Sequence, residues 1–318
     1  MKNIAVLTVL VIILSVYSYA EESEGTSAER NYCFSFGPQF GFVYGQTMEY
    51  VYPLPGETKN ELLSELTWDM KPVFYYGVQA KFSRIDMTSG PGFFSSVSFK
   101  AGIPADSGVI EDRDWLWPAN SELTRFSSHT NRTDKFLWLD AAAGASFPIK
   151  SLLYIKPFIS GSWMRFSFTG RDGYGIYKDW PPKEQEWNVS GVVTSYQQDW
   201  LLLAAGFSIG TNILYPFSFD LSFQISPLTY CSATDNHFLI DIIFRDITQW
   251  GLFIEPSFNM SFVVKPVEFS FAFSYRHIGK TEGKSYGKES DKGFFLSPNK
   301  AGAGLSVVDS RFLVSLRL

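Results

Sequence analysis

One short segment combines a carboxylate and an imidazole at a spacing that suits water activation. In Asp235-Asn236-His237 the two side chains are two residues apart, and on an extended backbone such residues share a face. Asp235 could therefore orient the ring of His237 and favour the tautomer with a basic nitrogen. A polar triplet of this kind is more often a solvated loop, so the motif alone is weak.

A second segment, Glu111-Asp112-Arg113-Asp114-Trp115, brings two carboxylates onto one side of an extended chain. Like charges held close raise one pKa, so Asp112 and Asp114 could share a proton or bind a water molecule. The alternative interpretation is an acidic loop anchored by Trp115.

The other two histidines, His129 and His277, have structural interpretations as a loop residue and a residue at the rim. Ser128 beside His129 leaves a serine nucleophile open, and that mechanism requires Ser128 to reach His237. The three histidines lack the mutual spacing of metal ligands, so we expect no metal and no cofactor.

The segments around these residues alternate between large apolar and small polar side chains. Phe217 to Ser226 and Val267 to Arg276 do so without error, which is typical of strands with one apolar face. Aromatic residues make up 17% of the chain, yet mean hydropathy is close to zero. Helical membrane spans are excluded, because no long uncharged apolar stretch follows the N-terminal segment.

The pattern predicts an all-β protein, a ten-stranded antiparallel transmembrane β-barrel extending beyond the outer membrane. A soluble exported β-sandwich would alternate too, but the inward Ser, Gly, Gln, Asp and Lys residues favour a polar lumen. The strands are expected near 32–51, 58–86, 92–110, 135–148, 152–178, 194–212, 217–231, 243–264, 267–281 and 300–318. The polar stretches 111–134, 179–193, 232–242 and 282–299 are expected as loops at the outer mouth, and the Trp residues, among them Trp138 and Trp200, as an interfacial girdle.

The N-terminus has the features of a secretory signal peptide, with a positive start, an apolar run and small residues before position 21. We therefore expect residues 1–20 to be a signal peptide and residues 21–318 to be a single barrel domain. Cys33 and Cys231 should lie near opposite ends of the barrel as free thiols. The net charge of −5 argues against a nucleic-acid partner, and we expect a monomer in contact with outer-membrane lipid.

The order of an acidic pair followed far downstream by Asp-x-His, on a ten-stranded exported barrel, resembles the omptin family of outer-membrane proteases. Pro91 to Trp115 is similar to the third strand and catalytic loop of that family, and Met48 to Tyr52 to the top of its first strand. Arg165 to Thr169 is similar to its fifth strand. The resemblance covers essentially the whole mature chain.

The resemblance implies an endopeptidase at the bacterial outer membrane whose site faces outward and cleaves extracellular peptides or proteins. Asp112 and Asp114 would position the attacking water, His237 would be the general base, and Asp235 would orient it. The competing class is a non-catalytic barrel, an adhesin or a pore, with the same fold.

Two departures from the family concern substrate and lipid. The resemblance implies a preference for basic residues through two acids, and Glu49 stands at one position while Ala233 stands at the other; Glu111 is a nearby acid that could compensate. It also implies lipopolysaccharide as an activating lipid, bound by basic residues on the outer wall. Arg165 fits one such position, whereas Asp199 stands where another basic residue is expected.

Overall fold

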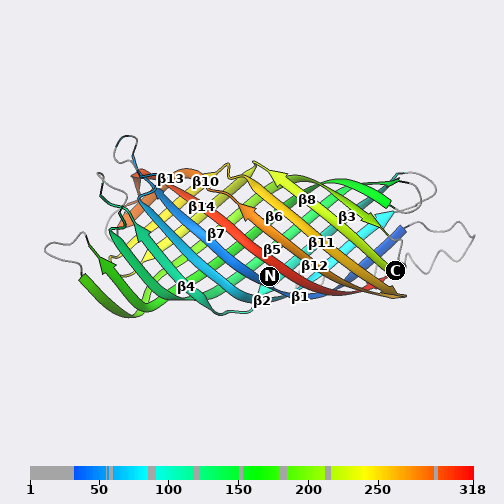
Figure 1. Ribbon diagram of the computed structural model, residues 1–318, viewed down its shortest axis with the longest axis horizontal. Helices are drawn as coiled ribbons and strands as arrows, with labels where there is room; N and C mark the ends of the chain where they lie inside the picture. Colours follow the sequence, from blue (N-terminus) through cyan, green and yellow to red (C-terminus); the bar gives the residue numbers. More distant parts are fainter. Residues whose placement is uncertain are drawn as a thin grey trace, which may run out of the picture. The chain divides into compact units, whose positions relative to one another are not determined.

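Tyr32 to Leu318 forms one compact unit in the computed structural model (Figure 1). The structure describes residues 32–54, 56, 60–84, 91–117, 122–149, 153–178, 185–211, 216–289 and 293–318. The predicted signal peptide, residues 1–20, lies outside the described residues. Within the described ranges no helix is both long and apolar enough to cross a membrane.

Fourteen strand segments make up the described fold. They are β1 (Tyr32–Tyr52), β2 (Ser64–Arg84), β3 (Gly92–Gly102), β4 (Ala105–Asp114), β5 (Arg125–Ile149), β6 (Leu153–Tyr177), β7 (Gln185–Thr211), β8 (Phe217–Ser226), β9 (Thr229–His237), β10 (Ile242–Gln249), β11 (Phe253–Val264), β12 (Val267–Ile278), β13 (Glu282–Glu289) and β14 (Phe295–Arg317).

The segments close into a ring of ten antiparallel strands. Four strands are each interrupted by a short break, which gives the pairs β3/β4, β8/β9, β10/β11 and β12/β13. β1 pairs with β14 along most of its length, so the sheet has no free edge (Figure 1). The prediction of a ten-stranded antiparallel barrel is confirmed.

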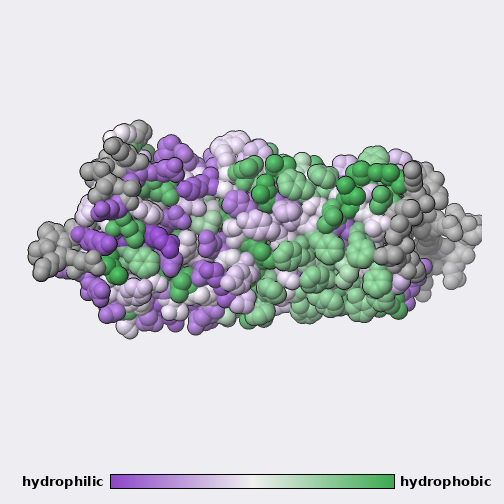
Figure 2. Space-filling model, in the orientation of Figure 1, coloured by the Kyte–Doolittle hydropathy of each residue, from purple (hydrophilic) through white to green (hydrophobic). Residues whose placement is uncertain are grey.

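The outer wall is apolar along one part of the barrel and hydrophilic along the other. Figure 2 shows hydrophobic side chains over the part that holds β3, β8, β11 and β12, and hydrophilic ones around β4, β10 and β13. The apolar belt includes Phe40, Phe42, Phe74, Tyr76, Val97, Leu201, Leu203, Phe207, Leu221, Ile225, Phe271 and Phe312, all exposed. A strand needs about 10 residues to cross the apolar band, so the 25 residues of β5 and of β6 extend well beyond it.

The stretches predicted as outer loops are largely strand, which corrects the sequence analysis. β4 continues to Asp114, β7 begins at Gln185, and β9 continues to His237. Outside the bilayer a strand can carry polar residues on both faces, because its outer face meets water instead of lipid. Apolar alternation therefore disappears there while the backbone pairing continues.

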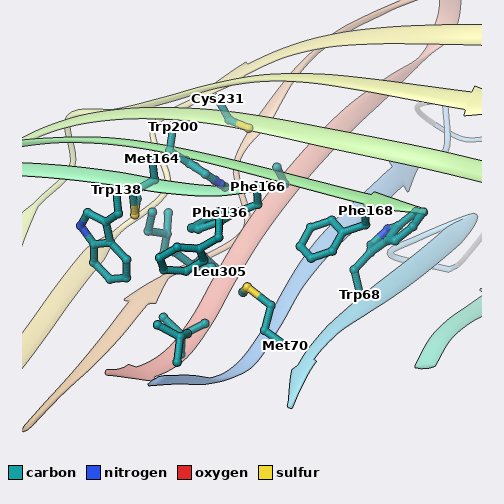
Figure 3. Packing of buried hydrophobic residues seen from close by; sticks show 14 of the residues in the cluster. Trp68, Met70, Phe136, Trp138, Met164, Phe166, Phe168, Trp200, Cys231 and Leu305 are labelled. Atoms are coloured by element: carbon teal, nitrogen blue, oxygen red, sulfur yellow. The ribbon is translucent and has the colours of Figure 1, made fainter. Parts of the chain in front are cut away.

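The lumen contains a layer of packed hydrophobic side chains where the sequence predicted a polar interior. The ring of Trp68 stacks on Tyr196. Phe136 packs against Trp138 and Phe166 (Figure 3). Trp138 and Trp200 are fully buried here, so their predicted place in an interfacial girdle is wrong. Both faces are apolar in this part of β5, where Leu137 and Leu139 alternate with the aromatic residues, so the pattern did not indicate which face points inward.

On the membrane side of this hydrophobic layer the lumen is lined by ion pairs. Lys100 Nζ lies 2.5 Å from Asp309 Oδ2, and Tyr75 Oη donates to Asp309 Oδ1 at 2.5 Å. Arg276 pairs with Glu255 and with Asp140. Each of these buried charges thus meets an opposite charge inside the barrel, as buried charges require.

Candidate active site

A bulge in the strand formed by β8 and β9 turns the Asp235 motif into the lumen. Ile225 lies opposite Ala205 of β7, whereas Thr229 lies opposite Leu202, so four steps on one strand match three on its neighbour. In β8 the odd-numbered residues face outward, and Phe217, Leu221 and Ile225 among them are exposed. In β9 the odd-numbered residues Thr229, Cys231, Ala233 and Asp235 are buried. Without this extra residue, strict alternation would direct Asp235 and His237 outward.

Asp235 and His237 contact each other directly. Asp235 is 1% exposed, its Oδ2 accepts a hydrogen bond from Nε2 of His237, and its Oδ1 accepts one from Thr194 Oγ1 at 3.0 Å. The imidazole and the ring of Phe244 also pack nearly perpendicular to each other. With Nε2 bonded to the carboxylate, a neutral ring carries its basic lone pair on Nδ1.

Asp112 and Asp114 lie at the end of β4 with their side chains on the lumen face. Ile110, two residues earlier on the same face, is buried in the hydrophobic layer. Ser64 Oγ of β2 donates to Asp112 Oδ1 at 3.2 Å, and the backbone oxygen of Asp114 accepts from Thr124 N at 2.8 Å. These contacts fix the position of the acidic pair.

The two pairs influence each other across the lumen mouth, although β4 and β9 are not neighbours in the sheet. Burial raises the pKa of Asp112 to about 8, the nearby Asp114 adds to the rise, and His237 opposes it. Burial by itself would lower the pKa of His237, but Asp235 and the two aspartates of β4 hold that pKa above its ordinary value. One site therefore combines an acid that keeps its proton at neutral pH with an imidazole whose cation is stabilised.

Glu49 of β1 is 5% exposed and completes a cluster of titratable side chains with Asp112, Asp114, Asp235 and His237. Burial raises its pKa well above the ordinary value, and the charges of Asp235, Asp246 and Asp112 raise it further. Glu111, the acid that could compensate for Ala233, points to the outer wall and pairs with Arg113. It therefore does not contribute to this cluster.

Asp246 of β10 is an acid in the cluster that the sequence analysis did not identify. It is 4% exposed and lies directly opposite Ala233 in the pairing of β9 with β10. Recognising residues 238–241 as a short turn would have identified Asp246. A turn of that length pairs His237 with Ile242, and this register places Asp246 opposite position 233. That pairing was hidden when 232–242 was interpreted as a loop.

Arg165 lies on the outer wall and is engaged by an acid of the next strand. Its Nε is 2.6 Å from Asp199 Oδ1, and Gln197 Nε2 donates to Asp199 Oδ2 at 2.8 Å. Asp199, which stands where the family pattern has a basic residue, is therefore the ion-pair partner of Arg165, which fits that pattern. Lipid binding by Arg165 stays a prediction.

The serine mechanism left open by the sequence does not form. Ser128 lies on the outward face of β5, whereas its neighbours Ser127 and His129 point inward and are buried. The ring of His129 lies between Ser127 Oγ, 3.1 Å from its Nε2, and the backbone oxygen of Asp172, 2.7 Å from its Nδ1. His277 stacks on Tyr275, outside the cluster.

Both cysteines are free thiols: Cys33 is half-buried in β1 and Cys231 is buried in β9. Among the described residues no three His, Cys, Asp or Glu side chains are grouped as metal ligands.

A closed antiparallel barrel with an apolar belt and a polar extension defines an outer-membrane protein, here with acidic and imidazole groups gathered at one opening. The chain belongs to the omptin family, whose model matches residues 30–316. The family and the architecture place it in the outer membrane.

Two known proteins show how far the similarity extends. The chain is 24% identical over 321 residues to the plasminogen activator of Yersinia pestis, with 96% of each chain covered. Its fold is similar to the crystal structure of the outer membrane protease OmpT from Escherichia coli, with a TM-score of 0.79 and 14% sequence identity. That match covers 93% of this chain and 100% of the other.

Proposed function

We propose that this protein is an endopeptidase that hydrolyses extracellular peptides or proteins with a water molecule activated by His237. The observation that carries the proposal is the direct contact of His237 with the buried Asp235, combined with the electrostatic coupling of both to Asp112 across the mouth. Membership of the omptin family supports peptide hydrolysis as the reaction class.

In the proposed mechanism His237 Nδ1 takes a proton from water while the oxygen attacks the peptide carbonyl. Asp235 stabilises the imidazolium that results and keeps the ring in place through its bond to Nε2. The imidazolium then gives its proton to the amine that leaves, which returns the base to its starting state. Positioned general-base assistance of this kind contributes about 10²- to 10⁴-fold.

Asp112 and Asp114 are proposed to bind the attacking water molecule and to share one proton. Because the pKa of Asp112 is about 8, one proton stays on the pair at neutral pH. That proton can be donated in a hydrogen bond to the carbonyl oxygen as negative charge develops there. The ionised partner can accept a hydrogen bond from the attacking water.

The hydrophobic layer in the lumen supports the enzyme over a solute pore, since Trp68, Phe136 and Phe166 fill the path that a solute would take. We further propose that residues 1–20 are removed as a signal peptide. The remaining 21–318 would act as a monomer in outer-membrane lipid, with the site facing outward and no cofactor.

The test is cleavage of a panel of internally quenched peptides by cells that carry the protein. His237→Ala and Asp235→Ala should each lower kcat/KM by about 10²-fold or more. His277→Ala, which removes an imidazole that stacks on Tyr275 outside the cluster, should leave cleavage unchanged. Cleavage that persists at the parental rate in both dyad variants would refute the mechanism.

A further inference from the structure

Two buried carboxylates at the lumen mouth each have an oxygen without a hydrogen-bond partner. These atoms are Glu49 Oε2 of β1 and Asp246 Oδ1 of β10. A buried polar oxygen without a hydrogen-bond partner costs free energy, so native proteins seldom leave one in that state unless a ligand completes it.

The charges that act on these two groups are acidic. Asp235, Asp246 and Asp112 all raise the pKa of Glu49, and burial followed by Asp235 raises that of Asp246, which Ser285 only partly offsets. A cation brought between Glu49 and Asp246 would therefore meet two carboxylates in a medium of low dielectric constant, where opposite charges attract strongly.

The strands between the two acids present small side chains to the lumen. Ala301 and Ala303 of β14 are buried there, with Ala303 opposite Glu49, and Ser285 of β13 lies opposite Asp246. A hydrogen-bonded link holds the wall together at this level, because Ala303 N donates to Thr281 Oγ1 at 2.9 Å and Thr281 Oγ1 donates to Thr248 Oγ1 at 2.7 Å. Ala301 and Ala303 therefore offer no polar side chain to the unpartnered oxygens of the two carboxylates.

Asp246 also occupies the place of a missing acid. It lies directly opposite Ala233 in the β9–β10 ladder, on the same lumen face. Facing residues of an antiparallel pair have their Cβ atoms about 5 Å apart. A carboxylate on β10 can therefore serve nearly the same volume as one on β9.

We propose that Asp246 is a specificity-determining residue that, together with Glu49, binds a basic side chain of the substrate next to the bond that is cut. The acid expected at Ala233 has in effect moved to the neighbouring strand. The inference rests on the proposed peptide hydrolysis, and it adds a residue that the family pattern does not contain. Glu111, which pairs with Arg113 on the outer wall, has no part in it.

The experiment uses quenched peptides that differ only in the residue before the scissile bond, which is arginine in one and its neutral isostere citrulline in the other. The full-length protein in outer-membrane vesicles should prefer arginine, and Asp246→Asn should reduce the ratio of the two kcat/KM values by about 30-fold, since a buried charge pair loses one partner. Glu111→Gln is the matched control and should keep the parental ratio.

A swap separates charge from folding. Asp246→Ala should lose the preference, and the double variant Asp246→Ala with Ala233→Asp should regain it, because the carboxylate returns to the lumen from β9. Heat-modifiable mobility on gels reports whether each variant is a folded barrel. An unchanged ratio in folded Asp246→Asn, or a swap that restores nothing, would overturn the proposal.

A binding measurement distinguishes this failure from failure of the proposed function. Fluorescence anisotropy with the arginine and citrulline peptides, on the His237→Ala variant, reports selection without cleavage. If no peptide is cut by the parental protein, peptide hydrolysis is wrong, yet tighter binding of the arginine peptide that is lost in Asp246→Asn would still support the subsite. Equal binding of both peptides would refute it.

Discussion

Charged residues line the lumen at two levels, and they are arranged in opposite ways. On the membrane side of the hydrophobic layer each acid has a cation, as in Lys100 with Asp309 and Arg276 with Glu255. At the mouth, Glu49 and Asp246 face other carboxylates and keep unpartnered oxygens. In the first arrangement the protein itself supplies the opposite charges. In the second, the carboxylates have no cationic partner until a basic ligand binds.

The difference separates stability from activity. Breaking a buried ion pair leaves an uncompensated charge and weakens the fold. Removing one of several crowded carboxylates relieves repulsion and desolvation instead, so it should cost function and little stability. Four changes test this contrast, in order of decreasing effect.

Asp112→Asn should lower kcat/KM by about 10²- to 10³-fold, because the shared proton of the acidic pair and its grip on water are lost. The free energy of unfolding should stay level or rise, since a buried carboxyl with a raised pKa is removed. Peptide cleavage and urea unfolding in lipid vesicles measure the two quantities. Full activity in Asp112→Asn would remove the pair from the mechanism; Glu111→Gln on the outer wall is the control.

Asp309→Ala should have the opposite signature. Lys100 and Tyr75 lose their partner in the barrel interior, so the free energy of unfolding should fall by about 3 kcal/mol. Urea unfolding in vesicles gives the value, and Asp246→Ala gives the comparison at the mouth. If both substitutions destabilise equally, the two levels of the lumen do not differ in the way described.

The preference for arginine over citrulline should fall about tenfold as pH is lowered through about 6. The pKa of Asp246 is raised to about 6 by burial and by Asp235, against the hydrogen bond from Ser285, so its charge is present above that pH and lost below it. Glu49, whose pKa is raised as well, loses its charge in the same direction. The ratio of the two peptides cancels the separate titration of His237, and a flat ratio between about pH 8 and about pH 5 would contradict the prediction.

Asp199→Asn should tighten lipopolysaccharide binding by less than about 1 kcal/mol, because it frees the guanidinium of Arg165 on the exposed outer wall. Titration of the detergent-solubilised protein with labelled lipopolysaccharide measures the change. Glu282→Gln, which frees Lys300 from a comparable exposed pair, is the control. An equal gain in both variants would indicate a general charge effect without a site at Arg165.

The membrane-spanning part of the fold could be predicted because lipid on one face and lumen on the other impose strict alternation, as in Phe217 to Ser226. An extension beyond the membrane was also predicted, but its strands, such as the upper part of β7, could not be told from loops, because they have water outside and lose that contrast. Trp138 was misplaced since both faces of its strand are apolar. Alternation from Phe217 would turn Asp235 outward, so a lumen-facing Asp235 requires a bulge between them, and the register places it between Ile225 and Thr229.

The residues of the candidate site were predicted from types and order, but their neighbours were not. Asp235 with His237 could be paired locally, since the two are adjacent on one face of a strand. Asp246 depends on which residue of β9 lies beside it, and such a cross-strand relation is set by the length of the turn between the strands. Burial, which raises the pKa of Asp112 and Glu49, depends on the assembled ring and is absent from any single segment.

Because of the extra residue between Ile225 and Thr229, odd-numbered residues face lipid in β8 but face the lumen in β9. Deleting a single codon at Leu228 would exchange the two faces of β9 and turn the imidazole outward, while the bilayer segment of β8 kept its pattern. In the strand formed by β8 and β9, membrane insertion therefore depends on one segment and the active site on the other. During evolution, enzymatic activity could thus be lost or regained through deletion or insertion of one residue, while the membrane-spanning part of the strand stayed the same.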